Sequence, residues 1–370
     1  MKDSEVIDLA NKAGYEVEIV EPIVQEASQR QYYRIYTSKD ADLDFEDRWN
    51  NPKIFILCYL DPQIGSHDKT VAINAALIRD EVFGLAPKIL FHDQELGITI
   101  QEDIGEEYLY DLYEKFGPPE SEHYHEYSYY GALEIALNLL DKIRRKKIPN
   151  LKKIQNKDLS NQMKTFESIY LQSFLCISPF EIALQRENLQ SLIDETINNL
   201  ELQPWVNCHT DFEGRNILIT PDFDWDDMFV IDYQDMCIGP VGIDLAGVIF
   251  DHYYFKDFNI DKIKECLLHE FDVFGLLDNR YDYPYDKETK EKIGNDIYEY
   301  ARWGAIQRNM RILGTLSNLY IKDNRSFRLP DLELVLSNLI QIIPDDHAQL
   351  KKFFKNTVLT TNNKRVKEII

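Results

Sequence analysis

The spacing of apolar residues changes once along this chain, near Gly105, and that change limits the folds open to it. Before Gly105, short runs rich in β-branched and aromatic residues are typical of strands. After Gly105, apolar residues recur three and four positions apart, as in long helices with one buried face. The sequence therefore predicts an α+β protein with a small sheet-rich lobe over residues 1–103 and a large helical lobe over residues 104–370.

The expected elements of the small lobe follow the order strand, strand, strand, helix, strand, strand, behind a short leading helix. They are residues 4–11 for the leading helix, then 15–20, 31–36, 53–60, 68–83, 87–91 and 97–101. In the large lobe, helices are expected at 128–145, 159–173, 179–200 and beyond 240, with two short strands at 216–220 and 228–232 joined by a turn at 221–224. The polar segment 357–370 is expected to fray, as chain ends commonly do.

Composition excludes several classes of partner. The net charge is −23, and no basic block interrupts the acidic side chains, so a nucleic-acid binder or a protein that binds anionic membranes is not expected. The five cysteines form no CxxC pair, which argues against a zinc or redox site and suits a reducing compartment. No apolar run is long enough to span a membrane. We expect a soluble cytoplasmic protein whose partner is a small molecule; its oligomeric state is left open.

The most informative motif has the spacing HxDxxxxN, at His209, Asp211 and Asn216, and a later strand ends at Asp232. Phosphoryl transfer requires a carboxylate beside the attacking hydroxyl and oxygen ligands for a magnesium ion that bridges the phosphates. Two paired strands would bring Asn216 and Asp232 together as metal ligands, with Asp211 as the catalytic carboxylate. His209 is expected to be structural rather than a base. A chance HxD is the alternative, and the strand context and the later aspartate argue against it.

The connection after Asp232 is short, with only twelve positions to Asp244. A protein kinase has a long activation segment there that ends in Ala-Pro-Glu, and this chain has neither, so the acceptor is expected to be a small molecule. Asp244 is expected to hold the catalytic loop in place. Asp235 is expected to touch the substrate or a water bound to magnesium; its alternative role is to cap a helix.

Three stretches, at 27–35, 207–240 and 307–323, resemble the aminoglycoside phosphotransferase and choline kinase superfamily. The likeness is strongest to the bacterial amino-sugar kinases of cell-wall recycling. It implies a protein-kinase-like fold with a small antiparallel sheet, the use of ATP and Mg²⁺, and phosphorylation of the anomeric hydroxyl of N-acetylmuramate or N-acetylglucosamine. Other acceptors, such as an aminoglycoside or a choline-like alcohol, stay open, as does a non-catalytic nucleotide-binding protein.

The chain departs from that family pattern in its small lobe. The lysine expected in the third strand has no counterpart in residues 54–59, and the first loop has no glycine. We expect Ser28 to cover the nucleotide phosphates and Arg30 or Arg34 to supply positive charge, since arginine can replace lysine as a phosphate partner. The alternative is that both arginines pair with acidic neighbours on the surface. Glu102 lies where the family has its adenine-binding hinge; the alternative is a plain acidic linker.

Arg308 lies on an apolar stretch of helix, where a charged side chain needs a partner. That partner is either a carboxylate of the substrate or an internal salt bridge, and the internal pair is slightly favoured. With Asp235, Arg308 completes the set of candidate substrate residues.

Overall fold

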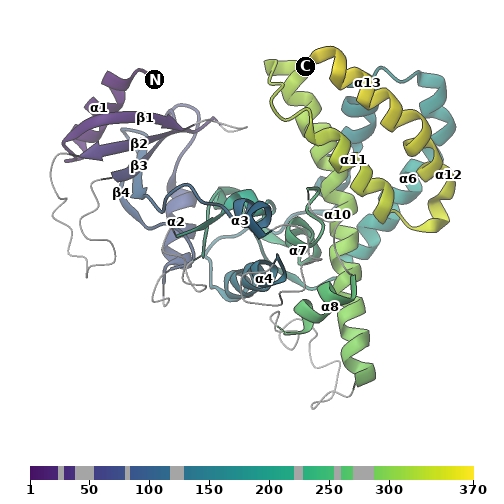
Figure 1. Ribbon diagram of the computed structural model, residues 1–370. Coiled ribbons are helices and arrows are strands. Elements are labelled where there is room, and N and C mark those ends of the chain that lie inside the picture. Colours follow the sequence, from purple (N-terminus) through teal and green to yellow (C-terminus); the bar gives the residue numbers. More distant parts are fainter. Residues whose placement is uncertain are drawn as a thin grey trace. The chain divides into compact units, whose positions relative to one another are not determined.

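The structure is a computed structural model that describes residues 1–23, 29–37, 54–79, 84–116, 129–220, 228–253, 260–269 and 287–370 (Figure 1). The chain divides into two compact units. Unit 1 consists of Met1–Glu107, Lys146–Asn150 and Leu218–Gln234, and unit 2 of Tyr108–Arg145, Leu151–Ile217 and Asp235–Ile370. This division differs from the expected boundary at residue 103, because unit 1 extends to Glu107 and takes in two later segments. One of those segments carries Asp232.

Unit 1 is built on a five-stranded sheet with the strand order β1-β2-β3-β5-β4, in which every neighbouring pair is antiparallel. The strands are β1 (Val17–Ile23), β2 (Gln31–Thr37), β3 (Ile54–Tyr59), β4 (Ile89–Asp93) and β5 (Ile98–Glu102), with α1 (Asp3–Lys12) before β1 and α2 (Asp68–Leu77) between β3 and β4. The predicted order of elements is confirmed. The second helix ends earlier than expected, at Leu77.

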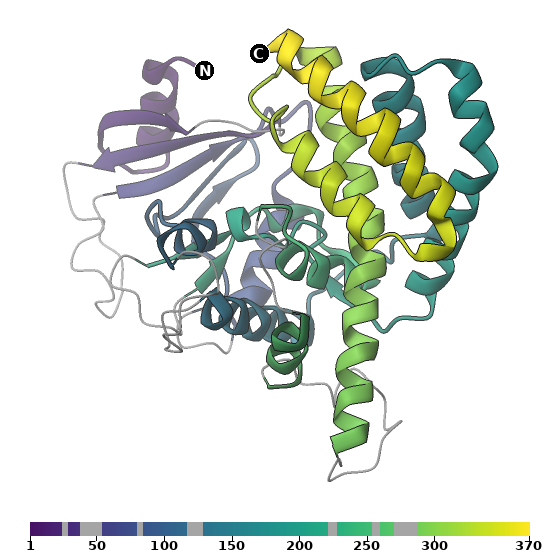
Figure 2. The ribbon, with the colours of Figure 1, turned by 45° about the vertical axis from the view of Figure 1, so that its right-hand side comes forward.

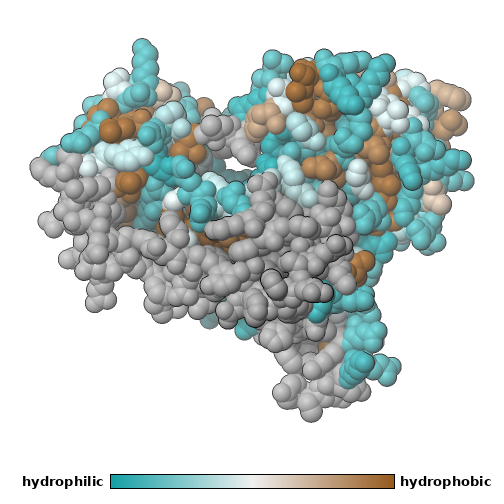
Figure 3. Space-filling model, viewed as in Figure 1, coloured by the Kyte–Doolittle hydropathy of each residue, from teal (hydrophilic) through white to brown (hydrophobic). Residues whose placement is uncertain are grey.

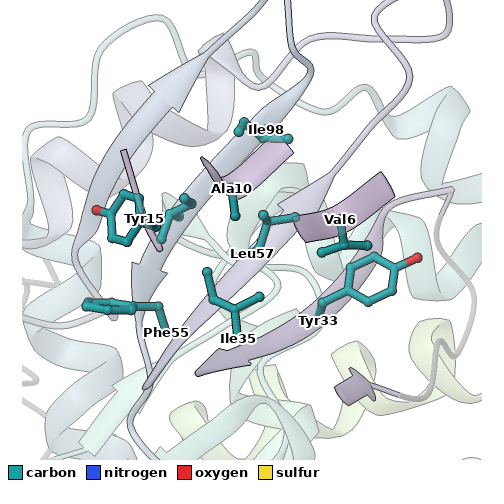
Figure 4. Close-up of a cluster of buried hydrophobic side chains, with 9 residues drawn as sticks. Val6, Ala10, Tyr15, Tyr33, Ile35, Phe55, Leu57 and Ile98 are labelled. Atoms are coloured by element: carbon teal, nitrogen blue, oxygen red, sulfur yellow. The ribbon is translucent and has the colours of Figure 1, made fainter. Parts of the chain in front are cut away.

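One face of this sheet packs against α1 (Figure 4). The buried cluster between them consists of Val6, Ala10, Tyr15, Tyr33, Ile35, Phe55, Leu57, Ile98 and Ile100. Side chains alternate between the faces of a strand, so the neighbours of these residues point away from α1. On that second face, Tyr32 lies opposite Cys58, and Cys58 lies opposite Thr99.

The two short strands predicted beside the HxDxxxxN motif are present as β7 (Ile217–Ile219) and β8 (Met228–Val230), which pair in a two-stranded sheet. All six of their residues are buried. The turn expected at 221–224 lies outside the described residues.

Unit 2 is mainly helical, and its longest helix is α10 (Lys287–Asp323). Among the described residues of this unit, the other α-helices of eight or more residues are α3 (Leu109–Phe116), α4 (Tyr129–Arg145), α5 (Asn156–Thr165), α6 (Pro179–Glu201), α7 (Gly242–Ile249), α8 (Ile260–His269), α11 (Asp331–Ile342) and α13 (Leu359–Ile369) (Figure 2). α10 contacts α5, α6, α7, α8 and α11. It comes closest to α7, where a Cβ added to Gly304 would lie 1.9 Å from the carbonyl oxygen of Gly242.

Two expectations for the helical part were wrong. The helix expected at 159–173 is α-helical only to Thr165 and continues as a π-helix, η1 (Phe166–Phe174). The end of the chain does not fray: α13 is an ordered helix, and its Asn362 is fully buried and accepts a hydrogen bond from the Tyr170 hydroxyl at 3.0 Å. A polar residue can therefore anchor a terminal helix when a distant hydroxyl is its partner.

The surface agrees with the acidic composition. On the face drawn in Figure 3, hydrophilic side chains cover most of the surface formed by the described residues, and apolar side chains lie in separate patches. Within the described ranges, no helix is both long enough and apolar enough to cross a bilayer.

Candidate functional site

The HxD segment lies in unit 2, between β6 (Trp205–Cys208) and the 3₁₀ turn η2 (Gly214–Asn216), and Asp244 of α7 holds it. The two carboxylate oxygens of Asp244 accept hydrogen bonds from the backbone N–H of His209 at 2.6 Å and of Thr210 at 2.8 Å. Asp244 is only 1% exposed. Burial raises the pKa of Asp244, and the bonds from the loop amides oppose that rise. The expectation that Asp244 holds the loop is confirmed.

Thr210, between the motif histidine and aspartate, has an unfavourable backbone conformation. Its φ is +76°, in the left-handed region that a β-branched residue rarely adopts. Such a conformation costs about 1–3 kcal/mol and persists only where the surroundings enforce it. Here they act on both sides of the residue: the N–H of Thr210 binds Asp244, and its carbonyl oxygen accepts a hydrogen bond from Arg311 Nη2 at 3.1 Å.

The candidate catalytic carboxylate, Asp211, forms an ion pair with the same arginine. Arg311 Nη2 lies 2.5 Å from Asp211 Oδ1, and the side chain of Asp211 is 39% exposed. Burial tends to raise the pKa of Asp211, but the charge and hydrogen bond of Arg311 outweigh it, so this pKa lies below its ordinary value. The carboxylate is therefore ionised at neutral pH. Sequence reasoning missed the part played by Arg311.

Asn216, the candidate metal ligand five residues on, is oriented by the loop itself. Its side-chain N–H donates to the carbonyl oxygen of Asp211 at 2.9 Å, and among the described residues no donor binds the amide oxygen of Asn216. The turn is closed by the Asn216 N–H, which donates to the carbonyl of Glu213 at 2.8 Å. An amide oxygen in this position is a hard donor of the kind that Mg²⁺ prefers.

Arg308 is occupied by an internal ion pair. Its guanidinium donates to the carboxylate of Glu213, and the Arg308 side chain is only 2% exposed. The favoured alternative for this residue, an internal pair, is what the structure shows. The other expectation, contact with a substrate carboxylate, is not supported, because the buried guanidinium presents almost no surface to a ligand.

A second arginine of the loop, Arg215, is held by aromatic rings. Its guanidinium carbon lies 5.3 Å from the ring centroid of Tyr110 and 4.9 Å from that of Tyr253. Arg215 also donates to the Tyr253 hydroxyl, which in turn donates to Asp331 at the start of α11. Side chains from α3, α7 and its following turn, α10 and α11 therefore all fix the loop.

In unit 1, Asp232 follows β8 and has an exposed side chain. Its φ is +61°, and its Oδ1 accepts a hydrogen bond from Gln234 Nε2 at 2.6 Å. The next residue, Tyr233, is buried, and its hydroxyl accepts a hydrogen bond from Asn74 Nδ2 at 2.9 Å. The buried Tyr233 thus fixes the backbone next to the exposed carboxylate of Asp232. Metal ligands are commonly held in one orientation by such neighbouring contacts.

The two candidate phosphate-binding arginines differ in their surroundings. Arg34 is held by carboxylates, with Nε 2.5 Å from Asp103 Oδ2 and a further ion pair to Glu106. Arg30 donates to Thr70 Oγ1 on α2 at 3.4 Å. The alternative of acidic partners is therefore what the structure shows for Arg34, whereas Arg30 also reaches the second face of the sheet.

The charges of Arg30 and Asp232 both act on Cys58, at the centre of that face. Burial is the main cause that raises the pKa of Cys58 to about 12, while Arg30 lowers it and Asp232 raises it. Both charged groups therefore lie near one buried thiol in unit 1. The structure brings the candidate phosphate partner and the candidate metal ligand into one neighbourhood.

The remaining candidates are less informative. Ser28 lies outside the described residues. Glu102 lies at the end of β5, and its side chain accepts the Lys88 N–H at 2.8 Å, which closes the end of the β4–β5 pair. Asp235 is exposed in the turn η3 (Tyr233–Asp235), and α7 begins seven residues later without a cap from it. Contact of Asp235 with the substrate stays a prediction.

Comparisons with known proteins find similarity to phosphotransferases and small-molecule kinases. Residues 85–261 match the family described as "Phosphotransferase enzyme family". A curated N-acetylmuramate/N-acetylglucosamine kinase from Neisseria meningitidis serogroup B is 22% identical over 170 residues, which is 46% of this chain and 46% of that protein. The match thus spans about half the length of this relative.

Solved structures resemble nearly the whole chain. An aminoglycoside 2′-phosphotransferase in its GDP complex has a TM-score of 0.57 at 10% identity, covering 91% of this chain and 98% of that one. A Plasmodium vivax ethanolamine kinase has a TM-score of 0.55 at 14% identity, covering 94% and 89%. A choline kinase from Streptococcus pneumoniae has a TM-score of 0.52 at 15% identity, covering 91% and 99%. At these identities the likeness shows the fold, and the predicted α+β, kinase-like architecture is confirmed.

Proposed function

We propose that this chain, which carries a phosphotransferase enzyme family domain over residues 85–261, is a small-molecule kinase that uses ATP and Mg²⁺. We propose further that its acceptor is an amino sugar, phosphorylated at the anomeric hydroxyl of N-acetylmuramate or N-acetylglucosamine. The observation that carries the proposal is the state of Asp211, which is ionised, 39% exposed and, among the described residues, hydrogen-bonded through Oδ1 alone. The similarity to an N-acetylmuramate/N-acetylglucosamine kinase supports the choice of acceptor.

In this reaction, Asp211 accepts a hydrogen bond from the acceptor hydroxyl and takes its proton as the new oxygen–phosphorus bond forms. The bond between the γ-phosphorus and its bridging oxygen breaks, and ADP leaves with that electron pair. No covalent enzyme intermediate is required, because Asp211 serves the alcohol directly.

The two proposed donors are of the chemical kind that a magnesium ion takes. Asn216 supplies an amide oxygen, since its nitrogen donates to the Asp211 carbonyl, and Asp232 supplies an exposed carboxylate. Mg²⁺ binds few protein oxygens and completes its shell with phosphates and water. When bound, the ion would neutralise charge on the phosphates. Arg30 is the proposed phosphate partner, because its charge and that of the proposed metal ligand Asp232 both act on Cys58. Arg34 forms ion pairs with Asp103 and Glu106.

The competing hypothesis of a non-catalytic nucleotide-binding protein is motivated by the missing lysine of β3. The geometry around Asp211 favours an enzyme, because two separate helices, α7 through Asp244 and α10 through Arg311, hold a strained loop in the form that presents this carboxylate. A purely nucleotide-binding protein has no use for a fixed acceptor-side base.

The decisive experiment is a phosphate-transfer panel with ATP and Mg²⁺, read by ³¹P NMR of the products. It includes both amino sugars, their 1-O-methyl glycosides, choline, ethanolamine and an aminoglycoside. We expect transfer to a free amino sugar and none to its methyl glycoside, in which only the anomeric hydroxyl is blocked. Equal transfer to the methyl glycoside would refute the anomeric position. Transfer to choline or to the aminoglycoside alone would replace the acceptor class, and nucleotide binding without any transfer would support the non-catalytic alternative.

A further inference from the structure

Two arginines one turn apart on α10 bind two carboxylates two positions apart in the HxD loop. Arg308 binds Glu213, and Arg311 binds Asp211. The two pairs differ in burial: the side chain of Arg308 is 2% exposed, whereas that of Arg311 is 21% exposed and its partner Asp211 is 39% exposed. The inner pair is a structural contact, and the outer pair lies where a substrate can reach it.

We propose that Arg311 is a positioning residue for phosphoryl transfer: one guanidinium nitrogen binds both Thr210 O and Asp211 Oδ1, and thereby aims Asp211 Oδ2 at the acceptor hydroxyl. This inference rests on the proposed function. Within the described ranges, Asp211 Oδ2 accepts no hydrogen bond, so the oxygen that Arg311 leaves free is available to the acceptor. A carboxylate has about four lone-pair sites, and one ion pair does not saturate it.

The hydrogen bond from Arg311 to the Thr210 carbonyl indicates that Arg311 orients the loop as well as pairing with the charge of Asp211. Thr210 has a φ of +76°, and Asp244 holds its N–H while Arg311 holds its carbonyl. Without Arg311, Thr210 keeps the restraint on its N–H and loses the one on its carbonyl, which is part of the peptide that leads into Asp211. The strained residue can then relax, and the carboxylate that follows it turns away from its working direction.

The test is a double-variant cycle with Arg311→Met and Asp211→Asn. Methionine keeps an unbranched apolar stem like that of arginine and removes both hydrogen bonds. We expect Arg311→Met to lower kcat about 10²-fold, the lower end of what a positioned acid or base contributes, with little change in the KM for ATP. In the Asp211→Asn background the same change should cost less than about threefold, because a residue that acts only through Asp211 has nothing left to position.

Three controls keep the outcome clear. Arg311→Lys should recover part of the lost kcat, because an ammonium group can still bind one or both oxygens. Arg308→Met should lower the melting temperature, whereas Arg311→Met should leave it nearly unchanged. Arg186 on α6 forms an exposed ion pair with Glu167, with Nη2 3.2 Å from Oε1. Arg186→Met removes this pair and should change neither kcat nor the melting temperature.

Equal losses from Arg311→Met in both backgrounds would overturn the inference, because they would show a general structural role. A wild-type kcat in Arg311→Met would overturn it as well, with the proposed function intact. If the wild-type protein transferred phosphate to no acceptor, the proposed function would fall and this inference with it.

Discussion

Asp251, two residues after α7, is a buried carboxyl whose replacement should stabilise the protein at neutral pH. It is 4% exposed, and its Oδ1 accepts the N–H of Tyr253 at 2.9 Å. Burial is the main cause that raises the pKa of Asp251 to about 6; Glu213 adds to the rise, while the bond from Tyr253 and the nearby arginines oppose it. The native state therefore disfavours the charged form of this side chain.

The sign and size of the effect follow from that pKa. Between its ordinary pKa of 3.8 and about 6, Asp251 binds more protons in the folded than in the unfolded chain, so the free energy of unfolding falls as pH rises through this range. A rise of roughly two units corresponds to about 3 kcal/mol lost by pH 7. Asp251→Asn keeps an oxygen for the Tyr253 N–H and carries no charge at any pH. We expect it to match the wild type near pH 4 and to exceed it by up to about 3 kcal/mol at pH 7.

The assay is urea unfolding followed by tryptophan fluorescence at several pH values from 4 to 7.5, with the variant and the wild type compared at each. The difference between them isolates this one group from all others that titrate. Asp345→Asn is the matched control. Lys351, 2.8 Å away, lowers the pKa of the exposed Asp345 carboxyl. The free energy of unfolding of this variant, relative to wild type, should therefore fall slightly as pH rises, whereas that of Asp251→Asn should increase. A difference between Asp251→Asn and wild type that stays constant across the range would refute the reasoning.

Three further predictions concern the loop and its metal. Asp211→Asn should leave ATP binding nearly intact and lower kcat by at least about 10²-fold, because Asp211 takes the proton of the acceptor hydroxyl in the transition state and does not bind ATP. A near-wild-type kcat in steady-state assays would contradict the assignment of Asp211 as the catalytic carboxylate. Asp232→Ala should weaken the Mg²⁺ dependence of ATP binding, measured by titration calorimetry at several Mg²⁺ concentrations; an unchanged dependence would place the metal elsewhere. Gly247→Ala should destabilise the protein by at least about 1–3 kcal/mol, since its Cβ would lie 1.9 Å from the Phe212 carbonyl oxygen in the loop; an unchanged melting temperature would count against this close contact.

The parts of the fold that could be predicted were those with a local signal. The strands of unit 1 alternate or form dense apolar runs, so their order was correct. The HxDxxxxN spacing singled out Asp211 and Asn216 from sequence distance alone, and the structure joins them by a hydrogen bond within one loop; their roles stay predictions. The role of Asp244 followed from its place shortly after Asp232.

What could not be predicted depends on contacts between distant positions. Arg311 lies 100 residues from Asp211, and only the packing of α10 brings them together. A signal was available, since two arginines three positions apart on an apolar helix both need partners. The sequence does not show which carboxylates form those ion pairs. Likewise, Asn362 looks like a residue of a frayed end until Tyr170, 192 positions away, is seen to bind it.

The make-up of unit 1 has a consequence for the order of events during synthesis. Its last segment, Leu218–Gln234, contains β8 and Asp232 and is made 127 residues after Met1–Glu107 is complete. At ribosomal rates of about 5–20 residues per second, all strands of the N-terminal sheet exist roughly 6–25 s before the last segment of unit 1 is complete. During that interval the second face of the sheet, with Cys58 at its centre, lacks the segment that carries its acidic neighbour. The nascent chain therefore has an exposed sheet face to protect, and a ribosome stalled before residue 234 would release a unit that cannot complete its own fold.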